Sequence, residues 1–134
     1  MIIDIVKIII MVTIAAIGWI VAHYFTSRRD IRSKRRDLST EYLIQAYRTL
    51  TNDVSHREST NENRVALEET LSDIQLFGSE EQISMAHKLA DDVANGGSFE
   101  LDPLINSLRM DLRKQLALPP VKGNVKWLRF SGHP

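Results

Sequence analysis

The 134-residue chain contains no cysteine, which excludes disulfide bonds, thiolate metal ligands and a cysteine nucleophile. Proline and glycine are also scarce, because between Trp19 and Asn95 there is no proline and Gly78 is the only glycine. So few chain breakers through the middle of a sequence are typical of helices. Once a membrane segment is set aside, the length allows one small soluble domain, in which a deep substrate cleft is not expected.

The chain also has no net charge, with 17 basic and 17 acidic residues, but the two signs are unevenly placed. Residues 1–36 contain seven basic and two acidic residues and therefore carry +5, so the remainder carries −5. Basic charge gathered beside an apolar segment, ahead of an acidic domain, is typical of a membrane protein.

The apolar segment covers residues 8–27, which contain no Asp, Glu, Lys or Arg. A helix of about 20 residues spans about 30 Å, the thickness of the hydrocarbon core of a bilayer. Trp19, His23 and Tyr24 lie toward its basic end, where amphipathic rings favour the membrane interface. The sequence therefore predicts one transmembrane helix, with residues 1–27 as the membrane anchor.

The basic residues lie after the apolar segment, in the juxtamembrane segment 28–37, whereas only Lys7 precedes it. A cleaved signal peptide has the opposite arrangement. The positive-inside rule predicts that this flank is cytoplasmic and the N-terminus outside, in the inner (plasma) membrane. Without interleaved aromatic residues, the flank favours contact with anionic lipid over nucleic acid. The candidate lipid contacts are Arg28, Arg29, Arg32, Lys34, Arg35 and Arg36.

Small residues recur along the membrane segment, where Ala15, Gly18 and Ala22 fall on one helical face. A small-xxx-small pair such as Gly18 and Ala22 lets two helix backbones approach closely. These residues are candidates for helix packing. They can equally face lipid, because Gly and Ala are common in membrane helices.

Beyond the flank, residues 38–117 are expected to form a helical bundle. The polar segment 53–63 predicts a loop, and a second helix from about 62 to 77 should end at Gly78 in a left-handed conformation. The apolar stripe that continues the first helix consists of Leu43, Ala46, Tyr47, Leu50 and Val54. The apolar residues of the second helix are Val65, Leu67, Leu71, Ile74 and Phe77.

Two further helices follow. Ser79 and Gln82 match a capping box that begins the third helix. Asp102 as N-cap and Pro103 as first helical residue are predicted to begin the fourth helix, and Pro119-Pro120 should end it. The short link at Gly78-Ser79 predicts that the second and third helices are antiparallel neighbours. The expected core stripe of the third helix is Ile83, Ala86, Ala90 and Val93, beside Met85 and Leu89, and that of the fourth is Leu104, Ile105, Leu108, Leu112 and Leu116.

The stretch DIQLFGSEEQISMAHKLADD (residues 73–92), together with the membrane helix and basic flank, resembles small uncharacterised bacterial proteins. Those proteins join one N-terminal membrane helix to a helical cytoplasmic domain. The resemblance implies an architecture and carries no activity or site residues.

Catalytic and metal-binding patterns are not evident. His56, His87 and His133 are scattered, and His87 with Asp91 makes only a partial ligand pair, so we interpret it as a surface imidazole. The adjacent acid pairs, such as Glu80-Glu81, point in different directions on a helix and cannot share a pocket. We therefore expect no enzyme, no cofactor, no metal and no small-molecule substrate.

The tail, residues 118–134, combines Trp127, Leu128 and Phe130 with basic residues and has no acid. Two large aromatic side chains seldom stay solvated, so they are expected to dock on the bundle. A partner-binding strand and a second contact with the bilayer are the alternatives.

Together these features predict an all-α protein: a single N-terminal transmembrane helix, a small cytoplasmic helical bundle and an extended C-terminal tail. The function expected is a membrane-tethered, non-enzymatic interaction or regulatory module at the cytoplasmic face, acting on a protein partner or by self-association. The alternative is a small membrane effector that oligomerises through its transmembrane helix and perturbs the bilayer.

Overall fold

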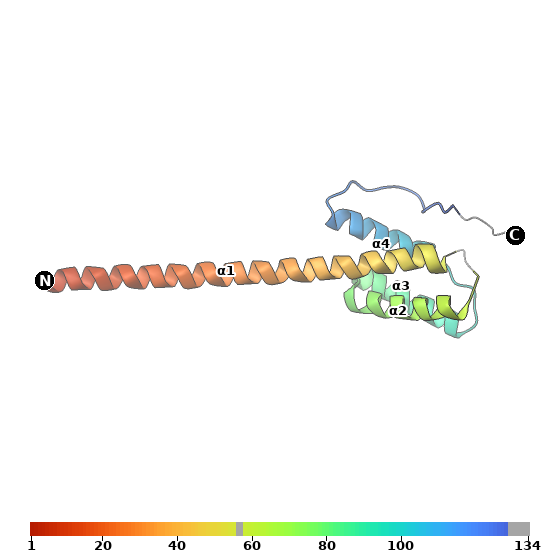
Figure 1. Cartoon of the computed structure of the whole chain (residues 1–134), viewed down its shortest axis with the longest axis horizontal. Helices are drawn as coiled ribbons and strands as arrows, with labels where there is room; N and C mark the ends of the chain where they lie inside the picture. Colours follow the sequence, from red (N-terminus) through yellow and green to blue (C-terminus); the bar gives the residue numbers. More distant parts are fainter. Residues whose placement is uncertain (56–57, 129–134) are drawn as a thin grey trace. The chain divides into compact units, whose positions relative to one another are not determined.

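The computed structural model describes residues 1–55 and 58–128, and over these residues the chain is helical with no strand (Figure 1). The fold class is therefore all-α, as predicted. The helices are α1 (Ile2–Thr49), α2 (Asn61–Phe77), α3 (Glu80–Ala94) and α4 (Asp102–Gln115), with a π-helical turn η1 (Leu50–Val54) after α1. The chain divides into two compact units, Met1–Leu38 and Ser39–Pro134.

The first unit is the larger part of α1. Its most apolar stretch is long and apolar enough to cross a membrane, and none of that stretch is buried within the structure. α1 continues without a break past the basic segment, as the absence of glycine and proline predicts. An exposed helix of this apolarity would be unfavourable in water, and a lipid environment removes that cost.

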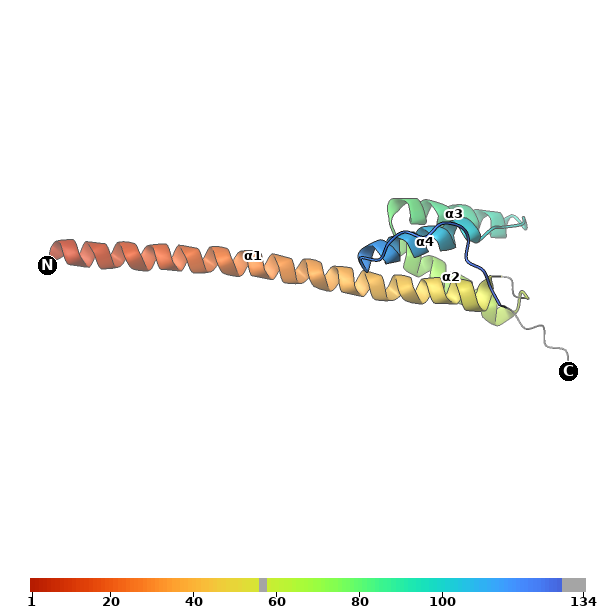
Figure 2. The ribbon, with the colours of Figure 1, turned by 90° about the horizontal axis from the view of Figure 1, so that it is seen from above.

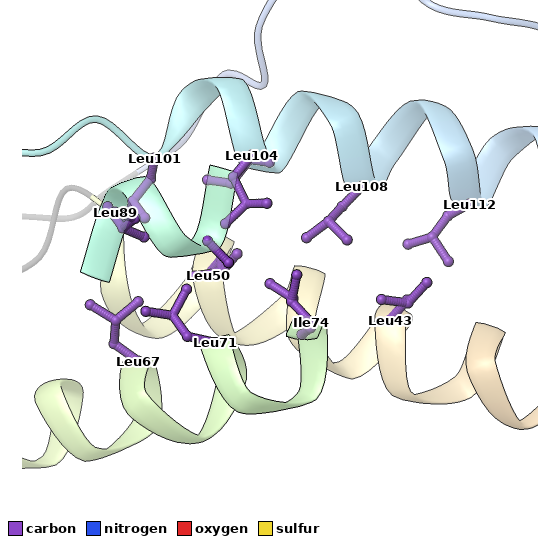
Figure 3. Close-up of a cluster of buried hydrophobic side chains, with 13 residues drawn as sticks. Leu43, Leu50, Leu67, Leu71, Ile74, Leu89, Leu101, Leu104, Leu108 and Leu112 are labelled. Carbon is purple, nitrogen blue, oxygen red and sulfur yellow. The ribbon is translucent and has the colours of Figure 1, made fainter. Parts of the chain in front are cut away.

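The second unit encloses a single hydrophobic core, to which the end of α1 and all three later helices contribute. Figure 3 shows side chains of α4 pointing toward those of α1 and α2. The predicted stripe residues Leu43, Leu71 and Leu108 are all buried. The core consists of Leu43, Ala46, Leu50, Leu67, Leu71, Ile74, Ala86, Leu89, Leu101, Leu104, Ile105, Leu108 and Leu112.

α2 begins at Asn61, one residue from the predicted start, because the Thr60 side chain accepts a hydrogen bond from the Asn63 N–H at 3.2 Å. The predicted loop is shorter than expected, since η1 includes residues 53 and 54. Val65, predicted as core, is 45% exposed, whereas Thr70 is buried. Hydrophobicity alone thus misplaced one edge of the buried face of α2.

α2 and α3 pack against each other, and both views show α3 running back along α2 (Figures 1 and 2). The predicted left-handed Gly78 is wrong, because its backbone is extended, at φ −73° and ψ 167°. A Cβ on Gly78 would lie 2.5 Å from the Ile74 carbonyl oxygen, which accepts the Gly78 N–H. Close approach of the backbone, not a positive φ, is what requires glycine here.

The capping box of α3 is confirmed, with the Ser79 Oγ accepting from the Gln82 N–H and the Gln82 Oε1 accepting from the Ser79 N–H. The predicted core stripe is confirmed at Ala86 but is wrong toward the end of the helix. Gln82, Ala86 and Leu89 are the buried residues, while Ala90 and Val93 are exposed. The buried face of α3 is rotated relative to the prediction because Gln82 is buried. Its side-chain amide has hydrogen-bond partners, so Gln82 occupies a core position that hydrophobic periodicity assigns to an apolar side chain.

The start of α4 differs by one residue from the prediction. Leu101, not Asp102, holds the N-cap position and makes no side-chain cap, and Pro103 is the second helical residue. Leu101 is 7% exposed, so its burial in the core sets where the helix begins. The Asp102 carboxylate instead accepts a hydrogen bond from Asn124 in the tail, at 3.4 Å.

α4 also ends earlier than predicted, at Gln115, before the prolines at 119 and 120. Ala117 adopts a left-handed φ of 55°, and the Leu118 N–H donates to the Arg113 carbonyl at 2.8 Å. This closure satisfies the last carbonyls of the helix. Leu116, predicted as core, is 53% exposed as a result.

Candidate functional surfaces

The first candidate surface lies where the apolar stretch of α1 meets the basic segment. Phe25, Thr26, Arg28, Arg29 and Arg32 line a shallow hollow of about 410 Å³. The hollow therefore has an apolar side, formed by Phe25, and a side lined by three guanidinium groups.

Aromatic side chains precede this hollow. The Arg28 guanidinium carbon lies 4.7 Å from the centre of the Tyr24 ring, and the Trp19 and His23 rings stack at 5.5 Å. The cation–π contact limits the orientations of Arg28. These rings stand in the place where membrane helices carry their interfacial aromatic residues.

The basic residues of this segment are not neutralised by neighbouring acids. Arg28, Arg29, Arg32, Lys34, Arg35 and Arg36 are all exposed. Among the described residues, the recorded ion pair joins the N-terminal amine to Asp4 at 3.5 Å, far from this segment in the chain. The arginine donors therefore remain available for an external anion.

The predicted packing residues Ala15, Gly18 and Ala22 lie exposed on α1. A Cβ placed on Gly18 would meet no atom within 4 Å. This face is therefore open to lipid or to another helix.

The second unit contains a polar network that the sequence analysis missed. Gln82, only 1% exposed, donates from Nε2 to Asp111 Oδ2 at 3.5 Å, and Gln115 Nε2 donates to the same oxygen at 3.2 Å. Thr40 donates to the Gln115 side-chain oxygen. One chain of hydrogen bonds thus joins α3, α4 and the part of α1 that lies in this unit. Nothing in the local pattern distinguishes Gln82 from an ordinary capping residue.

A groove of about 790 Å³ lies between the start of α3, α4 and residues 118–120. Met85, Met110 and Leu118 supply its apolar lining, with Glu81 and Lys114 among its charged residues. Methionine side chains adapt readily to different partner shapes. The sequence analysis expected no such groove, because its lining comes from residues that are far apart in sequence.

The tail runs without regular secondary structure over residues 118–128 and is held to α4 by polar contacts. Arg113 Nε donates to the Pro119 carbonyl at 2.7 Å, and Arg109 donates to the Gly123 carbonyl at 3.3 Å. Asn124 accepts from the Asn106 side chain at 2.6 Å.

Two side chains of the tail then reach the core. Val125 and Trp127 are half-buried against it, whereas Leu128 is 77% exposed. Phe130, the other candidate docking residue, lies outside the described residues. The structure therefore separates an inward-facing Trp127 from an outward-facing Leu128.

His87 is exposed, and its Nε2 lies 3.1 Å from the Gln75 side-chain oxygen rather than beside Asp91. Within residues 1–55 and 58–128, no group of three or more potential ligand side chains is arranged to hold a metal ion. His56 and His133 lie outside the described residues.

No protein-family model, curated protein or solved structure matches the chain. The resemblance to small bacterial membrane proteins therefore stays a prediction.

Proposed function

We propose that the protein is a membrane-tethered, non-enzymatic interaction or regulatory module, held by α1 in the inner membrane with its second unit on the cytoplasmic face. The observation that carries the proposal is the exposed apolar stretch of α1 followed directly by exposed, unpaired basic residues. Lipid is the solvent in which such a stretch is stable, and the basic flank resists translocation.

The partner proposed is another protein or a second copy of the chain. Supporting this, the groove of the second unit offers adaptable apolar side chains, with Met110 41% exposed, and the tail presents Leu128 to solvent. Apolar cores with a polar rim are the usual form of protein interfaces. Pull-down of the full chain from membranes in mild detergent, read by mass spectrometry, should recover a defined soluble partner.

The orientation is tested by reporters fused to the C-terminus of the full chain. A reporter active only in the cytoplasm should function, and one active only outside the membrane should not. Activity of the outside reporter would overturn the proposal. Replacing the basic residues of segment 28–36 with glutamine should weaken the orientation, because the charge difference across the helix then falls.

The second candidate is a small membrane effector that oligomerises through α1. The open Gly18, on a face with Ala15 and Ala22, favours it. Gly18→Ile should then abolish self-association in detergent and any growth arrest on overexpression. If the wild-type chain recovers a soluble partner and causes no arrest, the module is favoured over the effector.

A further inference from the structure

We propose that Phe25, Arg28, Arg29 and Arg32 form a discrete site for the phosphate of one anionic phospholipid headgroup. The inference rests on the proposed membrane span and goes beyond a diffuse attraction between a basic flank and lipid. A discrete site predicts that some of the basic residues matter far more than others of equal charge.

Phe25 and the three arginines share one face of α1. Successive residues of an α-helix are turned by about 100°, so these four side chains fall within an arc of about 100°. Lys34 and Asp30 lie on the opposite side of the helix by the same geometry. Arg36 falls within the same arc, but it lies about 6 Å farther along the helix axis than Arg32, and only Arg28, Arg29 and Arg32 line the 410 Å³ hollow with Phe25.

The four residues also lie at the depth expected for the membrane interface. Phe25 and Arg32 are separated by about 10 Å along the helix axis, slightly more than the roughly 5–8 Å interfacial layer on each side of a bilayer, and the long Arg32 side chain can reach back over that difference. Phe25, 66% exposed, lies on the side of the acyl chains, and the arginines follow within two turns. Arg35 and Arg36 lie about 15 Å beyond Phe25, outside the phosphate layer.

The side chains of this site match the chemistry of a lipid phosphate. The guanidinium groups of Arg28, Arg29 and Arg32 have no ion-pair partner among the described residues, and Tyr24 orients Arg28. Planar guanidinium groups bind phosphate oxygens through paired hydrogen bonds. The apolar wall formed by Phe25 fits a ligand that is apolar beyond its phosphate. A phospholipid meets that requirement, and free phosphate or a nucleic-acid backbone does not.

The test uses the full chain in mild detergent with equal phosphatidylcholine and phosphatidylglycerol, and counts bound lipids by native mass spectrometry. Two variants remove the same charge: Arg28→Gln with Arg29→Gln and Arg32→Gln, and the matched control Lys34→Gln with Arg35→Gln and Arg36→Gln. Glutamine preserves helix propensity. The wild type and the control should retain one phosphatidylglycerol. In the first variant, binding of phosphatidylglycerol should fall by about a hundredfold, because each of the three arginines contributes roughly fivefold to binding.

Equal loss in both variants would overturn the site in favour of diffuse attraction. Selectivity for an anionic lipid would be overturned if the wild type retained phosphatidylcholine as well as phosphatidylglycerol. Displacement of the lipid by millimolar inorganic phosphate, or a preference for a short RNA over the lipid, would also overturn it. The proposed span is tested separately by alkaline extraction from vesicles. Extraction of the wild type would refute the span, whereas a retained protein with equal lipid loss in both variants would refute only the site.

Discussion

Replacing the buried Gln82 with alanine tests whether the polar network holds the second unit together. The Gln82 side chain accepts from the Ser79 N–H at 2.9 Å and donates to Asp111 at 3.5 Å. It therefore serves as a helix cap and as a link between α3 and α4. Alanine removes both hydrogen bonds and leaves a space in the core.

The expected cost is the sum of three modest terms. Loss of the reciprocal cap costs about 1 kcal/mol. The longer bond to Asp111 contributes about 0.5–1 kcal/mol, because Asp111 keeps its bond from Gln115. The vacated volume adds about 1 kcal/mol. The unfolding free energy of the variant should thus fall by about 2.5–3 kcal/mol, a decrease in Tm of roughly 10–24 °C for a unit of this size.

The assay is thermal unfolding of residues 39–134, which form a compact unit, followed by circular dichroism at 222 nm. Gln45→Ala is the matched control, because Gln45 is exposed on α1 and its loss should change the free energy by less than about 0.5 kcal/mol. Gln82→Glu keeps the cap acceptor but places two carboxylates together, so it should cost at least as much as alanine. A Gln82→Ala variant as stable as the Gln45→Ala control would refute the role of the network.

Three further predictions follow from the core and its edges, each read in the same unfolding assay. Leu108→Ala should cost about 2–5 kcal/mol because Leu108 is fully buried, and a change in Tm below 3 °C would contradict its core position. Trp127→Ala should lower the unfolding free energy by about 2 kcal/mol, less than the roughly 3–5 kcal/mol for a fully buried Trp, because Trp127 is half-buried. Leu128→Ala should leave the unfolding free energy unchanged, because Leu128 is exposed, and equal effects of the two substitutions would mean that the tail does not dock. Gly78→Ala should cost about 1–3 kcal/mol because its Cβ would lie 2.5 Å from the Ile74 carbonyl oxygen, and an unchanged Tm would show that the link relaxes freely.

The candidate surfaces differ in how much of each could be predicted from the sequence. The arginines and the apolar stretch are local features, so their positions on α1 follow from helix periodicity alone. The groove and the Gln82 network could not be predicted, because each depends on α3 and α4 being brought together. Trp127 shows an intermediate case: its size favoured docking, but only the structure shows that Trp127 turns inward and Leu128 outward.

By itself the sequence determined what depends on neighbours along the chain. The unbroken α1, the capping box at Ser79 and the buried stripes of α1 and α4 all follow from composition, spacing and side-chain hydrogen bonds within one turn. Tertiary structure decided the rest. The angular position of α3, the extended backbone of Gly78 and the burial of Leu101 depend on contacts between helices. A buried polar group becomes stable only when a partner from another helix satisfies it, and no local pattern records that partner.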